Sequence, residues 1–141
     1  MQMNKLIIGI LVISVIAFLY QKQTATPETN EPEQLKITST KPATLDEATI
    51  LPTDTIEITL NKPIYRSELK HRFDPEINHE VETINGIDKE LGQTFRIIFQ
   101  EPLGLGKGYT LFILSNTHDQ ENHNLDHEYI YHFKTISYRG I

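Results

Sequence analysis

The sequence contains no cysteine. Without cysteine a chain can form no disulfide bond, offers no thiol nucleophile, and lacks the residue through which bacterial lipoproteins are anchored. An Asn-x-Ser/Thr site for N-glycosylation is also missing, and Asn116-Thr117-His118 is the nearest approach to one. A domain exported from the cytoplasm must therefore be stabilised by its hydrophobic core.

Motifs of common catalytic centres are also missing. No serine stands in a G-x-S-x-G motif, and no H-E-x-x-H motif occurs. The glycine-rich stretch 104–108 is not a P-loop, because Lys107 is followed by Gly108 and not by Ser or Thr. Glu80 and Glu82 would share one face of a strand, which is more typical of a solvent-facing side than of an acid–base pair. We expect a protein that is not an enzyme and needs no cofactor.

One long hydrophobic run is present, at the N-terminus. Residues 6–20 carry no charge and follow Lys5. A helix over residues 3–20 would be about 27 Å long, close to the hydrocarbon thickness of a bilayer of about 30 Å. The run also fits a secretory signal peptide, but no A-x-A cleavage motif follows it. We therefore predict a transmembrane signal anchor over residues 1–20, with a cleaved signal as the alternative.

The distribution of charge predicts an orientation. The amino terminus and Lys5 precede the run, whereas Lys22 alone follows it before a series of glutamates. The positive-inside rule then places the N-terminus in the cytoplasm and the C-terminal domain outside it. All 19 acidic residues lie beyond residue 27, together with 11 of the 13 basic ones, so this part has a net charge of −8. Such a domain is not suited to binding nucleic acid.

The rest of the chain divides by composition. Residues 21–34 are rich in Thr, Glu and Gln, include Pro27 and Pro32, and contain no apolar residue larger than Ala25. This composition is typical of a disordered stalk. Residues 35–136 are enough for one self-sufficient core, and residues 137–141 form a short tail.

Apolar residues alternate with polar ones through most of residues 35–136. A period of two is the mark of a strand with one face on a core. We predict about seven short strands. A helix is possible only within residues 64–70, with at most two turns. The strands are expected over residues 35–39, 56–60, 69–73, 79–84, 95–99, 109–114 and 129–133.

Turn residues separate these runs. Asn85-Gly86 predicts a tight hairpin turn, and residues 90–92 predict a second turn. Five prolines are expected to fall between strands, where they remove no ladder donor: Pro42, Pro52, Pro63, Pro75 and Pro102. Seven strands and regular turns in about 100 residues predict an all-β, antiparallel β-sandwich.

Several short segments resemble the bacterial Ig-like domains of the S-layer type. Residues 38–43 and 55–64 resemble the family's "S-x-P-A" and "I-x-I-x-F-S-x-P-V" segments, with Leu60-Asn61 in place of F-S. Residues 95–111 are similar to its "L-x-P-L-x-x-G-x-x-Y-x-V", and residues 131–135 to its closing "F-x-F-x-T". The resemblance implies an Ig-like sandwich over residues 35–136. It also implies a binding, scaffolding or display module of the bacterial cell envelope, with an envelope protein or a polysaccharide as partner.

One cluster carries candidate chemistry. Residues 118–128 combine imidazole and carboxylate groups at close spacing, a combination that suits Zn²⁺ or Cu²⁺, while the oxygen ligands alone suit Ca²⁺. The candidate ligands are His118, Asp119, His123 and His127. The alternative is a solvated loop between the last two strands, since Asn, Asp and His tolerate turn conformations. A metal-binding module is therefore the second functional hypothesis.

Overall fold

The computed structural model describes residues 33–137. The predicted anchor, nearly all of the predicted stalk and residues 138–141 lie outside the described residues. Within residues 33–137, no helix is long and apolar enough to cross a membrane.

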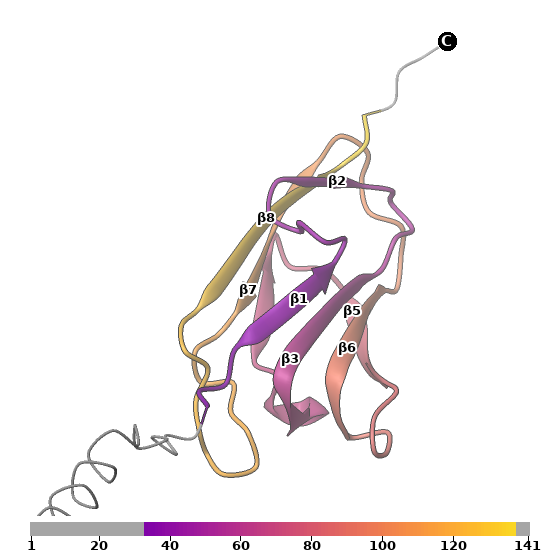
Figure 1. The fold of residues 1–141 in the computed structure, drawn as a ribbon. Coiled ribbons are helices and arrows are strands. Elements are labelled where there is room, and N and C mark those ends of the chain that lie inside the picture. The colour runs from indigo at the N-terminus through magenta and orange to yellow at the C-terminus, as the bar shows by residue number, and fades with distance from the viewer. Residues whose placement is uncertain (1–32, 138–141) are drawn as a thin grey trace, which may run out of the picture. The chain divides into compact units, whose positions relative to one another are not determined.

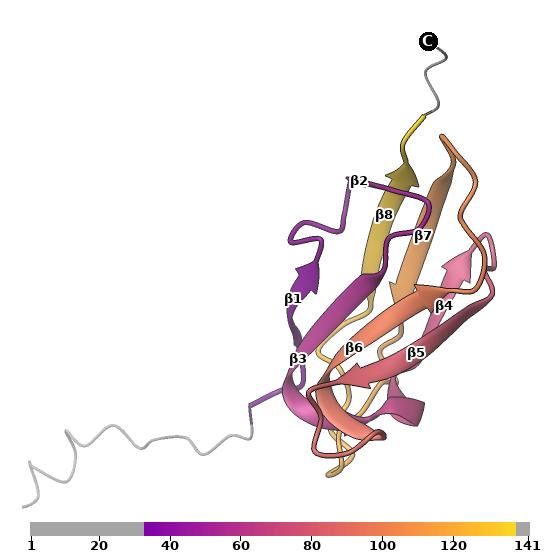
Figure 2. The same cartoon turned by 90° about the vertical axis from the view of Figure 1, so that its right-hand side faces the viewer.

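The described chain is built from strands (Figures 1 and 2). The single helical element is a short 3-10 helix, η1 (Arg66–Glu68), where a helix of up to two turns was predicted. The eight strands are β1 (Ile37–Lys41), β2 (Ala48–Ile50), β3 (Ile56–Tyr65), β4 (His71–Asp74), β5 (His79–Ile84), β6 (Leu91–Phe99), β7 (Gly108–Ile113) and β8 (Tyr129–Thr135).

The strands form two four-stranded sheets, with the orders β1-β3-β6-β5 and β2-β8-β7-β4. Figure 2 shows the two sheets as separate layers. All pairings are antiparallel except that of β2 with β8, which is parallel. The all-β prediction is confirmed. The strand count was one too low and the purely antiparallel arrangement was wrong, because β2 has only three residues and shows no alternation that could reveal it.

The core lies between the sheets and includes most of the alternating side chains that the sequence predicted to face it. Tyr129 and Tyr131 are partly buried against it. Leu35 and Leu45 are fully buried although they lie outside the named strands. The buried strand residues include Ile56, Ile58, Leu60, Phe95, Ile97, Leu111, Ile113 and Phe133.

Two turn predictions were wrong. Pro63 lies inside β3, and the pairing of β3 with β6 shifts register between Thr59 and Ile64, where the missing proline N–H breaks no regular ladder. A single connection over residues 85–90 joins β5 to β6, in place of two separate turns. Asn85 has a φ of 50°, but Leu91 and Gly92 already belong to β6.

Candidate functional site

The predicted site lies in the loop between β7 and β8, at one end of the sandwich. Leu125 forms a parallel bridge with Leu35, and His118 forms an antiparallel bridge with Asn124. Thr117 is fully buried, and its hydroxyl accepts the N–H of Lys70 at 2.9 Å and donates to the Lys70 carbonyl at 3.2 Å. These contacts hold both ends of the loop to the body of the domain.

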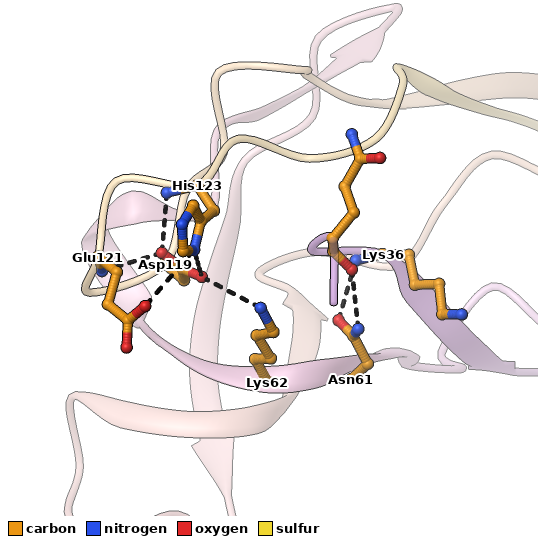
Figure 3. A network of polar contacts seen from close by, with 7 residues as sticks. Lys36, Asn61, Lys62, Asp119, Glu121 and His123 are labelled. Carbon is orange, nitrogen blue, oxygen red and sulfur yellow. Dashed lines mark hydrogen bonds and ion pairs between the residues drawn. The ribbon is translucent and has the colours of Figure 1, made fainter. Parts of the chain in front are cut away.

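Asp119 organises the middle of this loop (Figure 3). Its carboxylate accepts the backbone N–H groups of Glu121 and His123, each at 2.9 Å. It also accepts the Nδ1–H of the His123 ring at 3.0 Å, and Lys62 Nζ lies 3.8 Å away. A buried carboxylate that accepts this many hydrogen bonds stabilises the conformation of the turn.

The charge of Asp119 depends on these donors. Burial alone would raise the pKa of its carboxyl group. The N–H of His123, the His123 ring and the N–H of Glu121 outweigh burial and leave the pKa below its ordinary value. Asp119 is therefore ionised at neutral pH, and its oxygens are already occupied by partners within the loop.

The four predicted metal ligands do not converge. Asp119 and His123 are in contact, but His118 points to Glu68, with 3.1 Å between Nε2 and Oε2. His127 pairs with Asp126 at 3.1 Å and stacks on Tyr129, with ring centroids 3.9 Å apart. No group of three or more His, Asp or Glu side chains in residues 33–137 is arranged to hold a metal ion. Metal binding by this loop stays a prediction, and it would require the histidine rings to leave these partners.

The Asp119–His123 pair resembles half of a catalytic triad. In a triad the other ring nitrogen of the histidine activates a hydroxyl or thiol nucleophile. Among the hydrogen bonds of the described residues, none joins His123 to a serine or threonine hydroxyl. Within residues 33–137 the pair therefore consists of a ring and an orienting carboxylate, with no hydroxyl hydrogen-bonded to the ring.

A second surface, which the sequence reasoning missed, lies at the other end of the sandwich. Leu51, Leu105 and Ile136 expose 49%, 53% and 39% of their surface. Three backbone hydrogen bonds bring their segments together: Ile136 N–H to Ile50 C=O, Gly106 N–H to Ile136 C=O, and Leu103 N–H to Pro52 C=O. We call these three aliphatic side chains the distal patch.

A cavity of about 240 Å³ lies at the same end. It is lined by the turn between β4 and β5 and by the connection between β6 and β7, including Ile77, Pro102 and Lys107. Tyr109 also lines it, and the Tyr109 hydroxyl accepts the N–H of Gly104 at 3.0 Å. The distal patch therefore lies at the same end of the sandwich as a cavity with both polar and apolar lining residues.

The sequence held only a weak signal for this end. Leu51 and Leu105 lie in loops, where single exposed apolar residues are common. Their proximity depends on the pairing of β2 with β8, which the sequence did not reveal.

Comparisons with known proteins give a distant likeness. No protein-family model matches the chain, and no curated protein matches it. Among solved structures, the chain is similar to the S-layer protein rSbsC(31-844), with 15% sequence identity and a TM-score of 0.49. The match covers 73% of this chain and 14% of that one, so the chain spans about one seventh of that structure. The likeness reaches no further than a distant similarity in β fold.

Proposed function

We propose that the chain is a membrane-anchored, extracytoplasmic Ig-like module of the bacterial cell envelope, which binds a partner and does not catalyse a reaction. The observation that carries this proposal is the distal patch. Three exposed aliphatic side chains lie on three separate segments that backbone hydrogen bonds hold together at one end of the sandwich. Exposed apolar side chains on neighbouring loops are a candidate surface for binding another protein.

The strand order supports the Ig-like assignment. If the strands are lettered A, A′, B, C, D, E, F and G in chain order, the sheets read A-B-E-D and A′-G-F-C. Immunoglobulin sandwiches of the constant type have the same A-B-E-D sheet facing C-F-G. Tyr109, near the start of β7, accepts the N–H of Gly104 five residues upstream, as the tyrosine corner of these domains does.

The position of the distal patch fits display from an N-terminal anchor. The chain enters the sandwich at Leu35, which forms a bridge with Leu125. Leu125 lies four residues before the start of β8, so the entry point is next to that end of the strand. Ile136 follows the other end of β8, a strand of seven residues that spans about 20 Å. The patch is thus at the end of the sandwich remote from the point of entry, and this leaves it accessible to a partner.

Photocrosslinking in the native envelope tests the proposal. A photoreactive residue at position 51 or at position 105 should give a crosslinked product of one discrete mass. With the probe at position 51, the substitution Leu105→Asp should reduce the yield of that product about tenfold or more. A probe at Gln120, in the loop at the other end, is the matched control and should give no such product. Equal products from positions 105 and 120, or none from either, would reject the distal patch as the binding surface.

A loss of folding must be separated from a loss of binding. Leu51 and Leu105 are about half exposed, so their substitution by Asp should change the free energy of unfolding by only about 0.5 kcal/mol. A variant that binds less and unfolds like the wild type therefore reports on the surface itself.

A further inference from the structure

Two histidine rings meet on the side of the sandwich where β4 and β5 lie. His71 begins β4 in one sheet, and His79 begins β5 in the other. Their Nε2 atoms are 2.7 Å apart. The ring centroids are 5.0 Å apart and the ring planes are inclined by 66°. The centroid separation exceeds the nitrogen separation by about the radii of the two rings, so the nitrogens face each other along the line between the rings.

The outer nitrogens fix the protonation of both rings. His71 Nδ1 lies 2.8 Å from the Leu69 carbonyl oxygen, and His79 Nδ1 lies 2.6 Å from that of Ile77. A carbonyl oxygen only accepts, so each Nδ1 carries a proton and each neutral ring has its lone pair on Nε2. Two lone pairs facing each other at 2.7 Å would repel. One added proton converts this contact into an N–H···N hydrogen bond.

The distance favours a proton over a metal ion as the bridging group. Tetrahedral zinc holds its imidazole nitrogens about 2.0–2.1 Å from the metal, which separates two such nitrogens by about 3.3 Å. A separation of 2.7 Å is that of a short hydrogen bond. The lone pairs also point at each other and not toward a common third position.

The surroundings limit the pair to one added proton. The Phe73 ring meets His79 edge-on, with centroids 4.9 Å apart, while Ile113 and Phe99 are the strand partners of the two histidines. No salt bridge within residues 33–137 involves either ring. The charged residues on the neighbouring elements face elsewhere: Lys70 pairs with Glu68, Arg72 lies over Phe112, and Asp74, Glu76 and Glu80 are exposed.

Burial opposes a second positive charge. Burial is the largest influence on the pKa of His71 and lowers it. The Leu69 carbonyl raises it in part, and the charge of His79 lowers it again, so that the pKa of His71 is below its ordinary value. This agrees with a His71 ring that stays neutral and accepts the hydrogen bond within the pair.

We propose that His71 and His79 share a single proton and form a pH-sensitive clasp between the β4 edge of one sheet and the β5 edge of the other. These two strands are not hydrogen-bonded neighbours in either sheet, so the clasp is a polar link across this side. A second proton places two N–H groups against each other and opens the clasp. Loss of the shared proton restores the opposed lone pairs and also opens it.

The clasp also reaches the turn that follows β4. His79 holds the carbonyl of Ile77, and residues 75–78 line the cavity beside the distal patch. The clasp therefore lies next to a turn at the proposed binding end, and a second proton on Nε2 leaves the Nδ1–H hydrogen bond to that turn in place. The clasp itself does not depend on the binding proposal, because it concerns folding alone.

A double-mutant cycle over a range of pH tests the clasp. The free energy of unfolding of the full chain is measured by urea denaturation from pH 5 to 8.5 for wild type, His71→Gln, His79→Gln and the double variant. Between the two titrations of the pair, the two rings of the folded state together hold one added proton. In the unfolded state the two histidines hold two added protons at low pH and none at high pH, and the change is centred at about pH 6.5. The coupling energy should therefore be largest near pH 6.5 and fall on both sides.

Two further measurements keep the test decisive if a variant fails to fold. Nitrogen-15 NMR of the wild type should show one protonated and one unprotonated Nε2 at pH 6.5, in rings whose Nδ1 atoms are both protonated. His132→Gln, an exposed histidine on β8, is the control and should show no coupling with either position. Independent titration of the two rings, or stoichiometric Zn²⁺ binding that either substitution abolishes, would overturn the proton clasp.

Discussion

At the residue scale, Asp119 has a structural role in its loop that the sequence analysis did not predict, while its role as a metal ligand stays a prediction. Its carboxylate was predicted as a metal ligand, yet its oxygens are occupied by the N–H groups of Glu121 and His123 and by the His123 ring. The spacing of Asp and His along the chain could not distinguish these uses. The distinction depends on the loop conformation, including the positive φ of 63° at Asn122.

Asp119→Asn should destabilise the domain in a pH-dependent way. The pKa of Asp119 is lower in the folded state than in the unfolded state, so its ionised form contributes stability above about pH 4 that is lost as pH falls further. We expect the variant to lose about 1–3 kcal/mol at pH 7 and less at pH 3, measured by urea denaturation. Glu121→Gln, at an exposed side chain, is the control. An equal loss at both pH values would contradict the role of the ionised carboxylate.

Tyr109→Phe should remove the hydrogen bond that the Tyr109 hydroxyl accepts from the Gly104 N–H. Because the backbone donor then loses its partner near the buried Tyr109 ring, the free energy of unfolding should fall by about 1–2 kcal/mol. Tyr131→Phe is the matched control, because the Tyr131 hydroxyl forms no hydrogen bond with another residue of the 33–137 segment. It should change the free energy of unfolding by about 0.5 kcal/mol or less. A larger effect at Tyr131 than at Tyr109 would reject the tyrosine corner.

At the element scale, strands with strict alternation were predicted well and short or irregular ones were not. The predicted strand 79–84 coincides with β5, and the predicted strands 95–99 and 129–133 lie within β6 and β8. β2 escaped prediction because three residues carry no period, and its partner β8 lies more than 80 positions away. The histidine pair escaped for a similar reason, since its contact exists only after β4 and β5 join different sheets.

The hairpin between β5 and β6 gives a test at this scale. A Cβ at Gly92 would lie 2.5 Å from Thr83 Cγ2 and 3.0 Å from Gly86 Cα, both too close for an unstrained contact. Gly92→Ala should therefore lower the free energy of unfolding by about 1–3 kcal/mol. Thr83→Ser removes the obstructing methyl group and should restore part of this loss in the double variant. Additive effects of the two substitutions would show that the clash is not between these residues.

At the scale of the whole molecule, the predicted topology can be tested because the chain contains no cysteine. A single cysteine at Thr53, an exposed loop position, should react with a membrane-impermeant maleimide on intact cells. A cysteine at Gln2 should react only after the cells are permeabilised, because the positive-inside rule places the N-terminus in the cytoplasm. The reverse pattern would overturn the proposed orientation, and release of the domain into the medium would support a cleaved signal.

The parallel pairing of β2 with β8 has a mechanical consequence. β2 follows the N-terminal entry into the domain and β8 leads to the C-terminal end, so tension between these ends pulls the two strands in opposite directions along their shared axis. The hydrogen bonds between residues 48–50 and 133–135 are then loaded together in shear, and not opened one at a time. We expect pulling from the two ends to require a higher unfolding force than pulling from positions 53 and 137, which bypasses β2, in single-molecule force spectroscopy. A domain with this arrangement should resist unfolding most strongly when its two ends are pulled apart.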